Sequence, residues 1–251
     1  MTSVQLIAFP FAGGNSRCYQ DLAQALPGHV ALVTHELPGH GLRMREPLQR
    51  RMPTLVDDAL ERLGARFDAP YALYGHSFGA ALARDVALRL RSLERRPPLA
   101  IFVSGRRAPA SKEVGTPIHQ LPGAAFHAKL AKYGGTPGAV LQNPELMEMF
   151  ERILRADLEA LETPTAEAST IPSPLDTPIR VMLGDDDDVT EEQGQAWQLE
   201  TQRSLTMSRF SGGHFFIREH ARRIALEIDE DIRAALSVQA SVAPPEDGAE
   251  A

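Results

Sequence analysis

The amino-acid sequence predicts an α/β protein with a mostly parallel central sheet, helices on both faces of that sheet, and a helical insertion. Two observations lead to this prediction. Short apolar segments alternate along the chain with longer segments of helical spacing, which favours a doubly wound sheet. The apolar segments are also nearly continuous in apolar character, as expected of strands that are buried on both faces of a parallel sheet.

Six short apolar segments are predicted as strands. Most of them are followed by a turn that contains glycine, which is a usual way for a strand to end. In chain order they cover residues 6–9, 30–34, 71–74, 99–103, 179–183 and, more weakly, 204–210.

Three segments between or after these strands have the apolar spacing of helices. They cover residues 54–67, 80–93 and 220–236. The last one repeats isoleucine or leucine at every fourth position from Ile224 to Leu236, which places these side chains on one face of a helix.

The alternation breaks between about residues 108 and 174, where no convincing strand is found. Within this stretch Asn143 and Pro144 have the residue types of a helix N-cap and first turn, and a strongly amphipathic helix is predicted to follow. We interpret the stretch as a lid over the sheet. Its turn-rich segment Tyr133-Gly134-Gly135-Thr136-Pro137-Gly138 is expected to act as a flexible hinge, and Leu146, Met149, Phe150 or their neighbours are expected to shape the pocket beneath it. The expected organisation is one domain over residues 1–236, with the lid at about 108–174 and a disordered acidic tail at 237–251.

Composition narrows the function classes. The net charge of −7 disfavours a nucleic-acid partner. The single cysteine, Cys18, excludes a disulfide within the chain and a cysteine-rich zinc site, and it fits a reducing compartment. No apolar run approaches membrane-spanning length, and the first residues lack the features of a signal peptide. We therefore expect a cytoplasmic monomer without a membrane segment, a metal or a bound cofactor.

The sharpest chemical motif is the segment Gly75-His76-Ser77-Phe78-Gly79, a Gly-x-Ser-x-Gly pattern. It directly follows a predicted strand and directly precedes a predicted helix, which is the context of the nucleophile elbow in the α/β-hydrolase fold. The turn is so tight that side chains at the two glycine positions would collide with it. Ser77 is the predicted nucleophile, and His76 is interpreted as structural.

A nucleophilic serine needs a base, which in this fold follows the serine and the acid in chain order. His214 lies in a glycine turn after the last predicted strand, from where it can reach the elbow. His119 and His127 fall in the predicted lid, and His220 falls at the start of the last helix. His214 is therefore the predicted base.

The acid that orients the base should follow the fifth strand, where Gly184 is followed by four consecutive aspartates. In this fold the acid commonly stands three residues after the glycine that closes the strand, which selects Asp187. Asp185, Asp186 and Asp188 remain alternatives for the acid. The aspartates that are not the acid would be turn formers or helix caps.

The oxyanion hole is predicted to use two backbone amides. One is the amide of Phe78, the residue after the nucleophile. The other should come from the loop after the first strand, where Gly13 and Gly14 let the backbone turn its N–H groups toward the site. Ala12 is favoured for this second amide, with Phe11 as the alternative.

Several segments along the chain form a recognisable set of motifs. They are Phe9-Pro10-Phe11-Ala12-Gly13-Gly14, Leu37-Pro38-Gly39 with Arg43 and Glu46-Pro47, the elbow, Val103-Ser104-Gly105-Arg106-Arg107-Ala108-Pro109, Arg155-Ala156-Asp157, and Gly212-Gly213-His214-Phe215-Phe216. Together they resemble type II thioesterases, the stand-alone editing enzymes of nonribosomal peptide and polyketide assembly lines. The resemblance covers about residues 5–235, and two departures stand out: His40 replaces the arginine that commonly follows Leu-Pro-Gly, and the loop after Gly184 is about one residue tighter.

The resemblance implies that the substrate is an acyl thioester on the phosphopantetheine arm of an acyl or peptidyl carrier protein, so that the arm belongs to the partner. The residues alone imply an ester or a thioester, which leaves an esterase or lipase for free small molecules as the alternative. A catalytically silent binding protein is disfavoured because serine, acid and histidine are present in order.

Two further expectations concern polar side chains away from the elbow. Because carrier proteins tend to be acidic, a basic docking surface is expected at Arg89, Arg91, Arg95 and Arg96 or at Arg106 and Arg107, although the first set also fits an ordinary solvated helix face. Asp157 lies on the apolar side of the lid helix, where an acid must be paired. A structural pair within the lid is the expected role for Asp157.

Overall fold

The computed structural model describes residues 3–111, 116–136, 138–163 and 173–242. Its centre is a six-stranded sheet with the order β2-β1-β3-β4-β5-β6, in which every neighbouring pair is parallel. The predicted strands are confirmed with small shifts of their ends. They are β1 (Val4–Phe9), β2 (Val30–Thr34), β3 (Tyr71–His76), β4 (Ile101–Ser104), β5 (Ile179–Gly184) and β6 (Leu205–Phe210).

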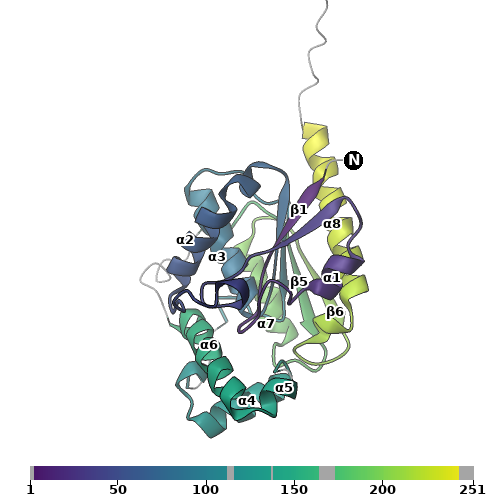
Figure 1. The fold of residues 1–251 in the computed structure, drawn as a ribbon. Helices are drawn as coiled ribbons and strands as arrows, with labels where there is room; N and C mark the ends of the chain where they lie inside the picture. Colours follow the sequence, from purple (N-terminus) through teal and green to yellow (C-terminus); the bar gives the residue numbers. More distant parts are fainter. Residues whose placement is uncertain (1–2, 112–115, 137, 164–172, 243–251) are drawn as a thin grey trace, which may run out of the picture.

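Helices cover both faces of the sheet, as predicted (Figure 1). One face packs against α2 (Met52–Leu63), α3 (Phe78–Ser92) and the short α7 (Glu191–Gln195). The other face packs against α1 (Gln20–Ala25) and α8 (Ala221–Val242). Each face therefore buries its own apolar core, which explains why the strand sequences are apolar on both sides.

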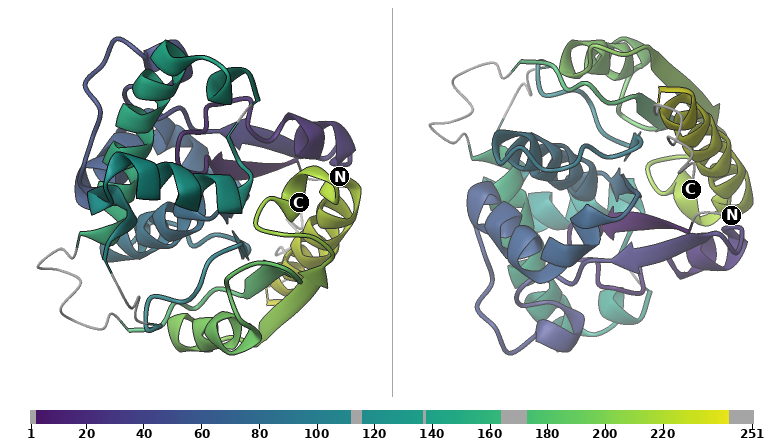
Figure 2. Two further views of the ribbon diagram at one scale, coloured as in Figure 1. Left: turned by 90° about the horizontal axis from the view of Figure 1, so that it is seen from below. Right: turned by 90° about the horizontal axis from the view of Figure 1, so that it is seen from above.

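The lid is formed by α4 (Gly123–Tyr133), α5 (Gly138–Leu141) and α6 (Pro144–Glu162), and the described part of residues 108–174 holds no strand. The side chain of Asn143 accepts hydrogen bonds from the amides of Glu145 and Leu146, so the predicted N-cap is confirmed. The three helices lie across the end of the sheet where the strands have their carboxyl ends (Figure 1), and the view from below looks directly onto them (Figure 2, left).

Two details of the fold differ from expectation. The short helices α1 and α7 were not predicted, because five or six residues are too few to show a helical period. Helix α8 also continues to Val242, so residues 237–242 are helical rather than part of a disordered tail. In this last part of α8, Ser237 and Ser241 donate side-chain hydrogen bonds to the carbonyls of Arg233 and Val238. Residues 243–251 of the predicted tail lie outside the described residues.

Candidate active site

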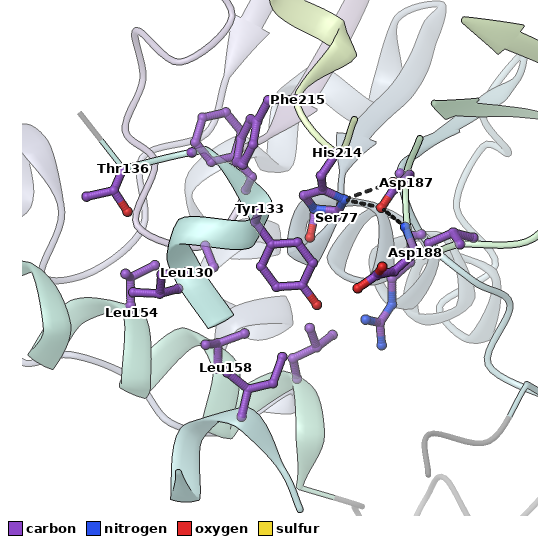
Figure 3. A pocket seen from close by; sticks show the side chains of 18 of the residues that line it. Ser77, Leu130, Tyr133, Thr136, Leu154, Leu158, Asp187, Asp188, His214 and Phe215 are labelled. Carbon is purple, nitrogen blue, oxygen red and sulfur yellow. Dashed lines mark hydrogen bonds and ion pairs between the residues drawn. The ribbon is translucent and has the colours of Figure 1, made fainter. Parts of the chain in front are cut away.

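A largely apolar cavity lies between the carboxyl edge of the sheet and the lid, with an empty volume of about 940 Å³ including its open mouth. Ser77, Asp187 and His214 all line this cavity although they come from three different loops (Figure 3). The fold thus brings together, at one place, the three residues that the sequence predicts as nucleophile, acid and base.

Ser77 occupies the turn between β3 and α3 with a strained backbone. Its φ is 55° and its ψ is −114°, a left-handed conformation that a residue with a side chain rarely adopts. The neighbouring glycines show why the turn is this tight. A Cβ on Gly75 would lie 2.1 Å from the carbonyl group of Gly79, and a Cβ on Gly79 would lie 2.1 Å from the carbonyl oxygen of Phe9. Both positions therefore require glycine.

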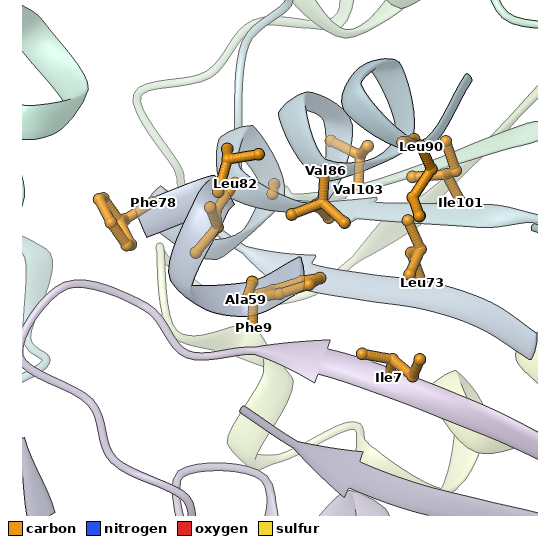
Figure 4. Packing of buried hydrophobic residues seen from close by; sticks show 14 of the residues in the cluster. Ile7, Phe9, Ala59, Leu73, Phe78, Leu82, Val86, Leu90, Ile101 and Val103 are labelled. Atoms are coloured by element: carbon orange, nitrogen blue, oxygen red, sulfur yellow. The ribbon is translucent and has the colours of Figure 1, made fainter. Parts of the chain in front are cut away.

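Helix α3 holds the elbow against the sheet. Its apolar face, from Phe78 to Leu90, is buried on β1, β3 and β4 (Figure 4). The helix begins at Phe78, so its unpaired N-terminal amides and the positive end of its dipole lie next to Ser77. The side chains drawn in this packing include Phe78, Leu82, Val86 and Leu90 on α3 with Ile7, Phe9, Leu73, Ile101 and Val103 on the strands.

His214 lies in the loop after β6, beyond Gly212, whose φ of 102° turns the chain. The Nδ1 atom of His214 is 3.0 and 2.9 Å from the two carboxylate oxygens of Asp187. The Asp187 side chain is 1% exposed and the His214 side chain 9% exposed. Because the carboxylate accepts a hydrogen bond from Nδ1–H, a neutral His214 ring carries its proton on Nδ1. The lone pair on Nε2 is then free to accept a proton.

The four consecutive aspartates have different surroundings, which separates the candidates that the sequence left open. Asp185 pairs with Arg209 at 2.8 Å, and Asp188 pairs with Lys132 at 2.6 Å and with Lys129 at 3.3 Å. The backbone amide of Asp186 donates to Gly212 at 3.0 Å. Only the carboxylate of Asp187 contacts His214 among the described residues.

The residues predicted to provide the oxyanion amides lie at the same cavity or next to Ser77. Ala12 and Phe11 both line it, and Phe78 provides the first amide of α3. The loop that carries Ala12 is a tight turn, in which the amide of Gly14 donates to the carbonyl of Phe11 at 2.8 Å. Gly13 has a φ of 74°, as the third residue of a type II turn does.

His76 is fully buried beside the base. Its Nδ1 atom is 3.0 Å from Ser104 Oγ, and its ring centroid is 4.9 Å from that of His214. Burial, followed by the nearby His214, lowers the pKa of His76 well below its usual value. A neutral, packed His76 agrees with the structural interpretation of this residue.

The lid provides the apolar wall of the cavity. Of the residues expected to shape it, Phe150 lines the cavity together with its neighbour Leu154, whereas Leu146 and Met149 are 39% and 47% exposed and do not line it. The reason is position along the helix, because the buried residues of α6 are Leu154, Ala156, Asp157 and Ala160, all beyond its N-terminal turns. The lining residues from the lid are Ile118, Leu130, Tyr133, Gly135, Thr136, Phe150, Leu154, Leu158, Leu161 and Glu162.

Tyr133 is a site residue that sequence reasoning placed only in a flexible hinge. Its ring centroid is 4.8 Å from that of His214, and it borders both the apolar cavity and a second cleft beside it. Gly135, two residues later, is packed against Phe215, because a Cβ on Gly135 would lie 2.2 Å from the Phe215 ring. The predicted hinge therefore contacts the loop of the base, and its Pro137 lies outside the described residues.

Asp157 does not pair within the lid, contrary to expectation. Its Oδ2 atom accepts from the backbone amide of Gly13 at 2.8 Å and lies 3.0 Å from His40 Nε2. Both partners belong to loops of the sheet domain, because the buried face of α6 is turned toward these loops. The Arg155 of the same motif stays within the lid, where it pairs with Glu151 and donates to the carbonyl of His119.

The predicted basic clusters lie in different places. Arg89 and Arg91 are in the last turn of α3, about 18 to 21 Å from Ser77 along the helix axis, and Arg95 and Arg96 follow the end of the helix. They are engaged within the chain, for example with Asp57, Asp68 and the carbonyl of Ser173. Arg106 and Arg107 instead line the cavity itself.

The parallel sheet, the elbow and the Asp187–His214 pair define a hydrolase of the α/β-hydrolase class. Residues 4–232 match the thioesterase domain family. Because this match covers most of the chain, the protein belongs to the thioesterase family.

Several relatives support this assignment. The linear gramicidin dehydrogenase LgrE of Brevibacillus parabrevis is 30% identical over 93% of this chain and 89% of its own. The type II thioesterase BorB from the borrelidin biosynthetic cluster is 34% identical, with a TM-score of 0.82 over 92% of this chain and 93% of its own. ClbQ from the colibactin NRPS/PKS pathway is 28% identical, with a TM-score of 0.87 over 94% and 100%. The resemblance to type II thioesterases is therefore confirmed.

Two features of the described residues bear on other functions. No helix among them is long and apolar enough to cross a membrane. They also contain no cluster of three or more His, Cys, Asp or Glu side chains that is suited to a metal ion.

Proposed function

We propose that this protein is a type II thioesterase that hydrolyses acyl groups from the phosphopantetheine arm of carrier proteins in nonribosomal peptide or polyketide synthesis. The observation that carries the proposal is the cavity in which Ser77, the Asp187–His214 pair and an apolar lid meet. The relatives BorB and ClbQ, which come from biosynthetic pathways of this kind, support the choice of substrate.

The proposed reaction is a two-step acyl transfer. Ser77 Oγ attacks the thioester carbonyl carbon while His214 Nε2 takes the serine proton. The carbon–sulfur bond then breaks, and the imidazolium returns the proton to the leaving thiolate. His214 next takes a proton from water, which attacks the acyl-serine ester, and the free acid and Ser77 are released.

Asp187 and two backbone amides assist this chemistry. The buried Asp187 carboxylate holds the Nδ1 tautomer of His214 and stabilises the imidazolium. The amides of Phe78 and Ala12 stabilise the oxyanion of both tetrahedral intermediates. Because these groups perform the whole reaction, the protein needs no metal or bound cofactor of its own, and the pantetheine belongs to the partner.

Delivery of the thioester is supported by the second cleft, which meets the apolar cavity at His214, Tyr133 and Phe215. This cleft is lined by glycine backbone and by charged residues of both signs, in contrast to the apolar lid wall. The charged residues are Lys132 and Arg218 with Asp186, Asp187, Asp188 and Glu219. A narrow polar arm fits the cleft while the acyl chain occupies the apolar cavity.

The dehydrogenase in the name of LgrE does not change the proposal. A nicotinamide site in a parallel α/β sheet commonly uses a Gly-x-Gly-x-x-Gly turn after the first strand. The corresponding turn here is Pro10-Phe11-Ala12-Gly13-Gly14, which lacks this spacing.

The test compares two substrates that carry the same acyl group. One is an acyl-carrier protein with a phosphopantetheine thioester, and the other is a free oxygen ester of the same acid. We expect kcat/KM to be higher for the carrier-bound thioester. An equal or higher value for the free ester would identify a small-molecule esterase instead.

A further inference from the structure

A buried polar contact joins the lid to the loop that carries the second oxyanion amide. Asp157 on α6 accepts a hydrogen bond from the amide of Gly13, 2.8 Å away, and its same oxygen lies 3.0 Å from His40 Nε2. The residues Asp157 and His40 are 1% and 3% exposed. The contact therefore links three segments that are far apart in the sequence.

The hydrogen bonds of His40 indicate which form of its ring is present. Nδ1 is 3.0 Å from the carbonyl oxygen of Pro38, which can only accept, and Nε2 faces the carboxylate of Asp157. With Asp157 ionised, the ring faces two acceptors and needs two N–H donors, so both contacts are satisfied by the charged imidazolium. A neutral ring would leave one lone pair facing an acceptor in a buried place, which is costly.

The charges around His40 favour this form. Burial tends to lower the pKa of His40, but the hydrogen bond and the charge of Asp157 outweigh it, with smaller help from Pro38 and Glu36, so that the pKa is raised above its usual value. Glu36 is itself held by Ser16 and contributes only at longer range. The nearby Arg43 is paired with Glu46 and Asp58. Glu159, two residues after Asp157 and on a different face of α6, is paired with Arg50.

The amide that Asp157 holds belongs to the middle peptide of the oxyanion turn, between Ala12 and Gly13. The turn is closed by the bond from the amide of Gly14 to the carbonyl of Phe11. Gly13 also packs directly on the lid helix, because a Cβ there would lie 2.9 Å from both Leu154 and Phe150. The orientation of this turn is therefore set by α6.

We propose that protonated His40 is a positioning residue, which through Asp157 fixes the Ala12–Gly13 peptide and thereby aims the Ala12 amide at the oxyanion. This rests on the proposed thioesterase function for its kinetic consequence. Neither His40 nor Asp157 lines the cavity, so both act through the loop and not on the substrate.

The proposal predicts an alkaline decline in turnover. The pKa of His40 is raised on folding, so its charged form contributes fully at low pH and is lost as pH rises through the raised value. Above that pH the neutral His40 ring turns a lone pair toward an acceptor, either the Asp157 carboxylate or the carbonyl of Pro38. The contact that fixes the Asp157 side chain is then lost, and its hydrogen bond with the Gly13 amide is less well held. Because the oxyanion forms only in the transition state, kcat should fall while KM changes little.

The experiment measures kcat and KM against pH for the wild type, His40→Arg and His40→Gln with one acyl-thioester substrate. Arginine keeps its charge at all accessible pH values, so His40→Arg should lose the alkaline decline. His40→Gln lacks the charge, and its kcat should be lower by about 10- to 100-fold at the pH optimum, less than for removal of an oxyanion donor. His127→Gln is the matched control, since His127 forms an exposed pair with Glu151 on the lid.

The result that overturns the proposal is an alkaline decline in His40→Arg that matches the wild type, or a His40→Gln variant with unchanged kcat. Folding is checked separately by the thermal midpoint, since removal of one buried partner destabilises a protein. A second measurement does not depend on activity. The NMR signal of the Gly13 amide should shift with pH in the wild type and stay constant in His40→Arg.

This second measurement separates the two proposals. If the wild type does not hydrolyse acyl thioesters, the proposed function fails, while a titrating Gly13 amide still supports the His40–Asp157 link. If hydrolysis is normal and the Gly13 amide does not respond to pH, only the positioning role of His40 fails.

Discussion

The carboxyl edge of the sheet and the lid hold their functional residues in different ways. At the sheet edge the backbone leaves no freedom, since Gly75 and Gly79 are in contact with neighbouring main chain and Asp187 is buried. The lid instead contacts the site through apolar side chains such as Leu130 and Leu158, and it is joined to the sheet domain by side-chain pairs such as Asp157–His40 and Lys132–Asp188. The difference teaches that the reaction and the selection of the acyl group are separate physical problems in this molecule.

This comparison has a direct consequence for mutations. Changes at the sheet edge should lower the rate for every substrate by a similar factor. Changes in the lid should alter which acyl chains are accepted while the best rate stays similar. The predictions below test this division, beginning with the largest expected effect.

Replacing Ser77 by alanine removes the nucleophile at the elbow. We expect kcat to fall by about 10⁶-fold, as loss of a triad nucleophile does in serine proteases, with the fold intact. The measurement is steady-state hydrolysis of an acyl thioester, with circular dichroism as the control for folding. Hydrolysis at a rate near that of the wild type would remove Ser77 from the mechanism.

Asp187→Asn tests the orienting acid. The amide cannot hold the required tautomer of His214, so kcat should fall by roughly 10³- to 10⁴-fold for short and long acyl chains alike. Asp185→Asn is the matched control, because Asp185 pairs with the exposed Arg209 and not with His214. If both variants lose activity equally, the contact with His214 is not what makes Asp187 important.

Leu158→Phe tests the lid side of the comparison. Leu158 lines the apolar cavity, and a larger side chain there shortens the space for the acyl chain. We expect kcat/KM for long chains to fall by about 10- to 100-fold relative to short ones, the range in which apolar pockets discriminate. Leu146→Phe, on the exposed N-terminal turn of the same helix, should leave the chain-length profile unchanged. An equal loss for all chain lengths in Leu158→Phe would contradict a separate selecting role for the lid.

The sheet edge was also the more predictable of the two regions. The strand–turn–helix context identifies Ser77, and chain order with a glycine turn identifies His214, because both signals are local in the sequence. Counting from Gly184 selected Asp187 from four neighbours, and the structure places its carboxylate on His214.

The lid was predictable only in outline. Its amphipathic helix and Asn143 cap follow from local periodicity, but the partners of Asp157 do not, because Gly13 and His40 lie 144 and 117 residues away. The residues of α6 that face the cavity also depend on which part of the helix lies against the sheet domain. Leu146 and Met149 were therefore chosen in place of Leu154 and Leu158.

The smallest expected effect concerns motion. Because the lid rests on side-chain contacts, its backbone amides should exchange with solvent faster than those of β3, β4 and β5. Within α6 the exposed first turns should exchange fastest, and the turns around Asp157 should be the most protected. Hydrogen exchange measured by mass spectrometry resolves these segments.

The same measurement with a bound partner shows whether the lid controls access. The inactive Ser77→Ala protein, mixed with an acyl-carrier protein, keeps the thioester in place during exchange. Binding of the acyl chain against Leu130 and Leu158 should slow exchange in α4 and α6 and leave the central strands unchanged, since these are already protected. If the lid amides exchanged as slowly as the strand amides, and the partner did not change their rate, the lid and the sheet edge would form one rigid unit. The two regions would then differ in sequence signal but not in mechanical role.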